Sequence, residues 1–142
     1  MKKLVYFHTA GVLADVFEAL TREYSEDVEI GHIVDAEVLA DLKARGEVDE
    51  DIAGRIRGRI REAIGSGAQL VVCTCSSVGA PAEAMDGIDG VPVQRIDRAM
   101  ADRAVAEGAS VVLAATLQST VGPTRDLLES SAKRAGKAID IR

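Results

Sequence analysis

The sequence predicts an α/β protein built on a parallel β-sheet with flanking helices. Two observations lead to this prediction. Short apolar runs rich in β-branched residues alternate with longer amphipathic stretches along the whole chain, and residues 70–75 are apolar almost without a break. Strand–helix alternation is typical of parallel sheets with right-handed crossovers. A continuous apolar strand is expected where helices cover both faces of a sheet.

Six strands are expected, and they divide into two groups. Residues 4–7, 28–34, 70–75 and 92–96 are expected to form one parallel sheet, with residues 111–115 and 138–141 in a second group. This arrangement predicts a first α/β lobe over residues 1–97 and the start of a second α/β lobe over residues 98–142. Because the chain stops as a new strand begins, we expect the second lobe to be incomplete and the sequence to be truncated.

The helices between these strands have recognisable start and stop signals. Asp49 and Asp97 are expected as N-caps, and Pro123 is expected in the first turn of a helix that runs to about Ala135. The helix after Asp49 carries isoleucines at a spacing of four residues, which predicts one buried face: Ile52, Ile56, Ile60 and Ile64.

Composition excludes several classes of function. The chain has 142 residues, 47% hydrophobic and 28% charged, with a net charge of −6. The negative charge argues against nucleic acid as a partner. No run approaches the ~20 apolar residues of a membrane span, so no membrane partner is expected. Two cysteines in a Cys-x-Cys arrangement favour a reducing, cytoplasmic location and match no zinc pattern. Phosphate-binding and dinucleotide-binding glycine motifs are absent, so we expect neither a metal nor a cofactor.

Three polar segments follow predicted strands, and ligands of parallel sheets bind where the strands end. These segments are His8-Thr9, Cys75-Ser76-Ser77, and Thr116 with Gln118, Ser119 and Thr120. Each precedes a helix, whose free N–H groups and dipole favour an anion. The prediction is a site for a small carboxylate. The alternative is that each cluster of hydroxyls simply caps its helix.

Cys75 is the sharpest candidate for chemistry. A thiol between a strand end and a helix start favours the thiolate form, which can act as nucleophile or base. The alternative, an inert core cysteine, stays open because free cysteine is often buried. Cys73 lies on the same strand face, deeper in the sheet, and is interpreted as core. His8 is a candidate acid or base, or a cap of the first turn, whereas His32 is interpreted as structural.

Two segments resemble the aspartate/glutamate/hydantoin racemase superfamily. Residues 70–77 (Leu-Val-Val-Cys-Thr-Cys-Ser-Ser) are similar to its first catalytic-cysteine segment, and residues 115–123 resemble the threonine-rich segment that opens the second half in the hydantoin racemase branch. The resemblance implies a two-lobe, Rossmann-like, cofactor-independent racemase or isomerase. Cys75 would then abstract the proton next to a carboxylate or carbonyl, while hydroxyl side chains hold the carboxylate: Ser76, Ser77, Ser119 and Thr120.

The sequence departs from that family in two respects. No cysteine follows Cys75, so the second base of the family is missing, and His8-Thr9 replaces the polar residue that follows the first strand. Two other functions therefore stay open: a non-catalytic small-anion-binding or regulatory protein on the same fold, and a lyase or decarboxylase with one thiol. The sequence also leaves open a homo-oligomer.

Overall fold

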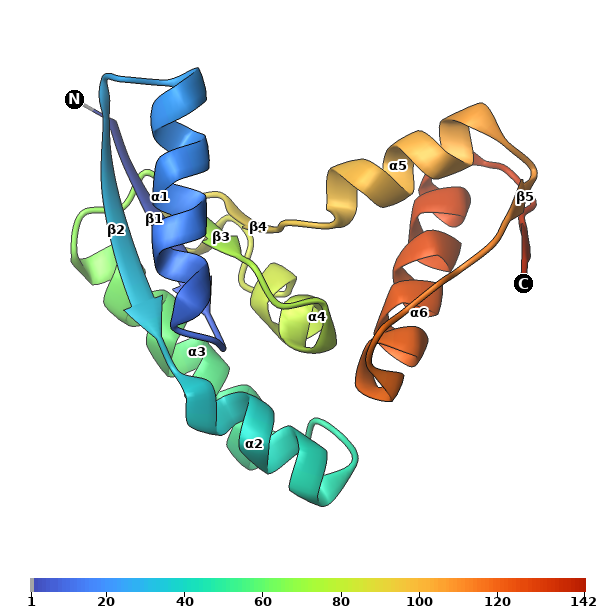
Figure 1. Ribbon diagram of the computed structural model, residues 1–142, viewed down its shortest axis with the longest axis horizontal. Helices are drawn as coiled ribbons and strands as arrows, with labels where there is room; N and C mark the ends of the chain where they lie inside the picture. Colours follow the sequence, from blue (N-terminus) through green and yellow to red (C-terminus); the bar gives the residue numbers. More distant parts are fainter. Residues whose placement is uncertain (1) are drawn as a thin grey trace.

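The computed structural model describes residues 2–142 and has two α/β lobes that lie side by side (Figure 1). Strands and helices alternate through the first lobe. Its elements are β1 (Lys2–His8), α1 (Val12–Tyr24), β2 (Val28–Val34), α2 (Ala36–Arg45), α3 (Glu50–Gly65), β3 (Leu70–Cys73), the 3₁₀ turn η1 (Ser76–Val78), α4 (Gly79–Glu83), the 3₁₀ turn η2 (Ile88–Gly90) and β4 (Val93–Arg95).

The four strands form one parallel sheet in the order β2-β1-β3-β4, which confirms the expected α/β architecture. The register pairs Phe7 with Cys73, and Cys73 in turn with Arg95. The carboxyl ends of β1, β3 and β4 therefore meet at one edge of the sheet. Two of the three predicted polar segments, His8-Thr9 and Cys75-Ser76-Ser77, are therefore carried to that edge.

The two faces of the sheet are covered by different helices. On one face, Val5 and Phe7 pack in the main core against the isoleucine stripe of α3, in which Ile52, Ile56 and Ile60 are buried as the spacing predicts. The stripe begins where expected, because the Asp49 carboxylate accepts a hydrogen bond from the Ile52 N–H at 2.9 Å.

Side chains alternate along a strand, so the next residues of β1 point to the opposite face. There α1 crosses the sheet. The rings of Tyr6 and Phe17 lie 5.2 Å apart, and the Tyr6 hydroxyl is 2.8 Å from that of Thr21. No residue of α1 is fully buried. The helix is therefore held by these contacts rather than by insertion into the core.

The second lobe consists of α5 (Arg98–Glu107), β5 (Ser110–Val111), α6 (Gln118–Ala135) and β6 (Asp140–Ile141). Its two short strands pair in parallel in a sheet of their own. A separate small core lies between α5 and α6 and contains Ala101, Val105, Leu127, Leu128 and Ala132.

Several boundaries differ from those expected. β3 ends at Cys73, two residues early, and β5 is shorter than residues 111–115. α6 begins at Gln118, so Pro123 lies inside the helix rather than in its first turn. Its ring nitrogen has no hydrogen to give to the Ser119 carbonyl, a loss that is tolerable one turn from the helix start. The helix expected after Cys75-Ser76-Ser77 is present but short, since the turn η1 leads into the five residues of α4.

One arginine connects the lobes. Arg98, the first residue of α5, donates to Glu83 of α4 at 2.7 Å and to the Ser131 hydroxyl of α6 at 2.9 Å. It therefore ties the last helix of the first lobe to both helices of the second.

Within residues 2–142, no helix has the length and apolar character needed to cross a membrane.

A buried carboxylate holds the carboxyl ends of β1 and β2 against α3. Asp35 donates its N–H to the His8 carbonyl at 2.9 Å, while its side chain accepts hydrogen bonds from Arg55 and Arg59 at 2.7–2.9 Å. Burial alone would raise the pKa of the Asp35 carboxyl, but the hydrogen bonds from Arg59 and Arg55 outweigh it and hold the pKa below its usual range.

We predict that Asp35→Asn lowers the free energy of unfolding by about 2 kcal/mol at pH 7, because it leaves the two arginines without their buried carboxylate. Because the folded-state pKa is lowered, this stabilisation is present above the usual Asp value and is lost as the pH falls. The difference between wild type and variant should therefore shrink below about pH 4. Urea denaturation at pH 7 and at pH 3 measures both values. Glu37→Gln removes an exposed partner of the same Arg55 and should cost at most about 0.5 kcal/mol. A pH-independent difference would contradict the argument.

Candidate functional site

The candidate site is built on the loop that leaves the sheet after β3. Thr74 continues the sheet by one more hydrogen bond, from its N–H to the Phe7 carbonyl at 3.0 Å. Cys75 follows with extended backbone and precedes η1. Its thiol is free and half-buried, whereas the Cys73 thiol is free and fully buried. Cys75 thus lies just beyond the strand end, at the sheet edge where ligands bind in this class of fold.

A buried ion pair supports this loop from beneath. The Arg95 side chain is 2% exposed and bonds Asp97 at 2.6 and 2.9 Å. It also donates to the Ser76 carbonyl at 3.2 Å. Asp97 stands at the start of α5 but makes no capping bond with its side chain, so its expected role as a cap is wrong: its carboxylate is committed to Arg95. Burial raises the pKa of Asp97, but Arg95 more than compensates and lowers it.

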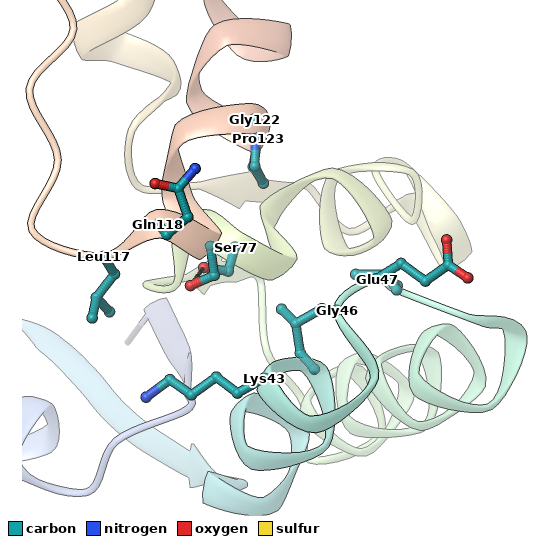
Figure 2. Close-up of a pocket in the computed structure, with 11 residues that line it drawn as sticks. Lys43, Gly46, Glu47, Ser77, Leu117, Gln118, Gly122 and Pro123 are labelled. Atoms are coloured by element: carbon teal, nitrogen blue, oxygen red, sulfur yellow. Dashed lines mark hydrogen bonds between the residues drawn. The ribbon is translucent and has the colours of Figure 1, made fainter.

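A cavity of about 600 Å³ lies between the lobes beside this loop. Figure 2 shows Ser77 between Gln118 above it and Lys43 and Gly46 below it. The Lys43 ammonium lies on the side of Leu117, whereas the Glu47 carboxylate is turned away from Ser77. The lining comes from the end of α2, the following loop, η1 and the start of α6: Leu42, Lys43, Gly46, Glu47, Val48, Ser77, Leu117, Gln118, Ser119, Gly122 and Pro123.

The structure brings together two of the three predicted segments. Ser77 is buried, and its hydroxyl donates to that of Ser119 at 3.4 Å, which links η1 of the first lobe to the start of α6 in the second. Gln118 lines the same cavity. Hydroxyl groups and a helix N-terminus therefore converge on one side of the cavity, a combination suited to an anion.

Other predicted residues of these segments lie beside the cavity rather than in its lining. Cys75 and Ser76 precede Ser77 on the same loop and are half-buried. Thr116 is exposed before the start of α6, and the Thr120 hydroxyl donates to the Leu117 carbonyl at 2.7 Å. Thr120 thus bonds back to the residue before the helix as a donor, which is not the capping contact, in which a hydroxyl accepts from a free N–H.

His8 and Thr9 are buried at the end of β1. His8 has no exposed surface, and both ring nitrogens are engaged at 2.9 Å: Nδ1 with the Thr74 hydroxyl and Nε2 with Nδ1 of His32. Burial, together with the charge of His32, lowers the pKa of His8 to about 4. His8 is therefore neutral at neutral pH and contacts the cysteine loop through Thr74.

Two residues of the candidate site were missed by the sequence analysis. Arg95 lies in a strand and Lys43 on a helix, and neither stands in a recognisable motif. The only signal for Arg95 is its place on the same face of β4 as the buried Val93, where an arginine requires a buried partner. Among residues 2–142, no cluster of three or more histidine, cysteine or acidic side chains is arranged to hold a metal ion.

Comparison with known proteins finds no family model that matches this chain and no match among the curated proteins.

Gly79, the first residue of α4, is the point at which the loop presses on Arg95. A Cβ atom at this position would stand 2.6–3.0 Å from three guanidinium atoms. Because those atoms are fixed by Asp97 and the Ser76 carbonyl, we predict that Gly79→Ala lowers the free energy of unfolding by about 1–3 kcal/mol. Chemical denaturation measures the change.

The matched control for this variant is Gly58→Ala, in the middle of α3, where a Cβ atom meets nothing within 4 Å. That change should stabilise the protein by up to about 1 kcal/mol, because alanine is the better helix former. If the two variants change the free energy of unfolding equally, the Arg95 side chain can move away from the new methyl group without destabilising the protein.

The two thiols are predicted to react at different rates. Burial raises the pKa of Cys73 to about 12, so its reactive thiolate is scarce and inaccessible near neutral pH. Cys75 is half-buried and should be alkylated by iodoacetamide at least ~10-fold faster. Mass spectrometry after a brief treatment compares the two sites. Equal labelling, or faster labelling of Cys73, would count against an active role for Cys75.

Proposed function

We propose that the chain acts on a small carboxylate by moving the proton on the carbon next to the carboxylate group, with the Cys75 thiolate as the base, as a racemase-like isomerase does. The observation that supports this most strongly is the contact between the two hydroxyl-bearing segments. Ser77 Oγ lies 3.4 Å from Ser119 Oγ beside a cavity that both residues line, and Cys75 stands two residues before Ser77.

The chemistry requires a base and a means of stabilising negative charge. When the thiolate takes the proton, the C–H bond breaks, an S–H bond forms, and the electron pair moves onto the carboxylate oxygens. Hydrogen-bond donors that are already in place lower the energy of this enolate. The hydroxyls of Ser77 and Ser119, with the free N–H groups at the start of α6, are suitable donors.

The charge around the cavity also favours an anionic ligand. The whole chain carries a net charge of −6, yet Lys43 lines the cavity and the Glu47 carboxylate is turned away from its centre. A local positive group inside an acidic protein attracts a small anion without making the surface attractive to nucleic acid.

The proposed mechanism has a base on one side only. Cys73 is fully buried in the core, and His8 is buried with both nitrogens bonded inside the protein. Racemisation needs a second group on the opposite face of the carbon, to return the proton there. The proposed activity of residues 1–142 is therefore exchange of the proton on one face, without inversion.

The second candidate is a non-catalytic site for a small anion. It is favoured by one observation: the lining of the cavity includes Lys43, Ser77, Gln118 and Ser119, whereas Cys75 stands beside it. A binding protein needs only the lining residues, while a proton-transfer enzyme also needs the thiol.

We predict that the protein exchanges the α-proton of one enantiomer of a small amino acid or hydantoin for deuterium, without detectable inversion. Incubation in deuterated water, followed by mass spectrometry and chiral chromatography, measures both. Cys75→Ala should slow the exchange at least ~100-fold, the usual contribution of a positioned base.

Cys73→Ala removes a thiol outside the cavity and should leave the exchange rate within a few-fold, although it weakens the core. Inversion by the wild-type chain would overturn the single-base argument. Exchange that survives Cys75→Ala would overturn the role of the thiol. Carboxylate binding that is lost in Ser77→Ala, with no exchange in any variant, would establish the anion-binding alternative.

A further inference from the structure

A chain of hydrogen-bonded side chains crosses the sheet face under α1 and ends at the residue before Cys75. It begins at the surface, where Glu18 Oε2 lies 3.2 Å from His32 Nε2. His32 Nδ1 is 2.9 Å from His8 Nε2, and His8 Nδ1 is 2.9 Å from the Thr74 hydroxyl. That hydroxyl lies 3.3 Å from the Phe7 carbonyl. The chain therefore has four contacts between a carboxylate at one end and a carbonyl at the other.

Counting hydrogens shows that two neutral imidazoles, with Glu18 ionised, cannot satisfy all four contacts. Each contact needs one hydrogen. The Thr74 hydroxyl supplies one, and each neutral imidazole supplies one, which makes three. The Glu18 carboxylate and the Phe7 carbonyl supply none. The fourth hydrogen has to be an additional proton on this series of hydrogen-bonded side chains.

The same count fixes the position of that proton. Thr74 gives its hydrogen to Phe7, so it accepts from His8 Nδ1. His8 Nε2 then carries no hydrogen and accepts from His32 Nδ1, which leaves His32 Nε2–H for the Glu18 carboxylate. His32 thus carries a hydrogen on each ring nitrogen, because an imidazole is in general a stronger base than a carboxylate. A neutral, fully buried His8 agrees with its lowered pKa of about 4.

We propose that the His8–His32 pair carries one proton, held on His32 by Glu18, and that this proton sets the direction in which the Thr74 hydroxyl points and so positions the Cys75 loop. When the proton leaves, three hydrogens remain for four contacts. The arrangement that keeps His32 Nε2–H bonded to Glu18 reverses the two inner bonds: Thr74 donates to His8 Nδ1, and His8 Nε2–H donates to His32 Nδ1. The bond from Thr74 to Phe7, the longest of the four, is lost.

The surroundings of the pair contain few other charges. From α1, Glu18 faces His32 and is itself within 3.7 Å of Arg22. From β1, the Tyr6 ring lies 5.7 and 5.8 Å from the two imidazoles. Asp35, whose N–H bonds the His8 carbonyl, has its carboxylate bound by arginines. Within the described residues, Glu18 is therefore the acid in direct contact with the pair.

The effect on Cys75 rests on the proposed function, whereas the proton count does not. The test is accordingly NMR of the full chain with ¹⁵N-labelled histidine, recorded from pH 5 to pH 9. The chain has only two histidines, so the spectra report four ring nitrogens. At low pH within this range, we expect His32 doubly protonated and His8 in the Nδ1–H form. As the pH rises, the two histidines should change over the same pH range. His32 should lose its Nδ1 proton, and His8 should pass from the Nδ1–H to the Nε2–H form.

Glu18→Gln removes the charge that holds the proton, so the shared transition should move to lower pH by about one unit. Glu23→Gln, on the same helix and exposed, is the matched control and should leave it in place. In the wild type, the rate of Cys75 alkylation should change over the same pH range as the two histidines. In Glu18→Gln, that range should move to lower pH by the same amount. A His8 that keeps one tautomer throughout, or two histidines that titrate independently, would overturn the proposal. A shared histidine transition with no counterpart at Cys75 would overturn its positioning role alone. The histidine titration and the alkylation rates can both be interpreted whether or not the protein exchanges the α-proton of a substrate.

Discussion

The parallel pairing of β1 with β3 is the constraint on which the rest of the site depends. It sets Phe7 opposite Cys73, and one more hydrogen bond, from Thr74 to the Phe7 carbonyl, carries the alignment past the end of the strand. His8 therefore meets Thr74, and Cys75 leaves the sheet where β1 and β4 also end. A slip of β3 by one residue would turn its side chains to the opposite faces, which would take Cys73 and Cys75 away from the main core and Thr74 away from His8.

Charge, rather than apolar packing, fixes the loops at this edge. Arg95 with Asp97 supports the cysteine loop, and Asp35 with two arginines fastens the ends of β1 and β2 to α3. Buried ions are costly unless fully bonded, and each of these carboxylates has at least two hydrogen bonds. The directional bonds hold the polar edge of the sheet in place without covering it with apolar side chains.

The sequence was sufficient for the architecture of the first lobe but not for the contacts of its charged residues. The grouping of four strands in one parallel sheet, the isoleucine stripe and the Asp49 cap follow from local periodicity and hydrogen-bonding chemistry, and the structure has them. Local signals could not tell that Asp97 bonds Arg95 instead of capping α5, because that contact depends on tertiary geometry. The same holds for His32, whose interpretation as structural could not include its bond to His8. The meeting of Ser77 with Ser119 was expected only in outline, from where two strands end.

The cavity is shared between the lobes, and this has a thermodynamic consequence for any ligand. Ser77 and Lys43 belong to the first lobe, whereas Gln118 and Ser119 belong to the second. The direct side-chain bonds between the lobes include a long Ser77–Ser119 contact and the ion pair of Arg98 with Glu83. An anion that bonds residues of both lobes binds the closed arrangement more tightly than an open one, so binding must stabilise that arrangement. Binding would then also bring the donors at the start of α6 toward the cysteine loop, which is the geometry that proton transfer at Cys75 requires.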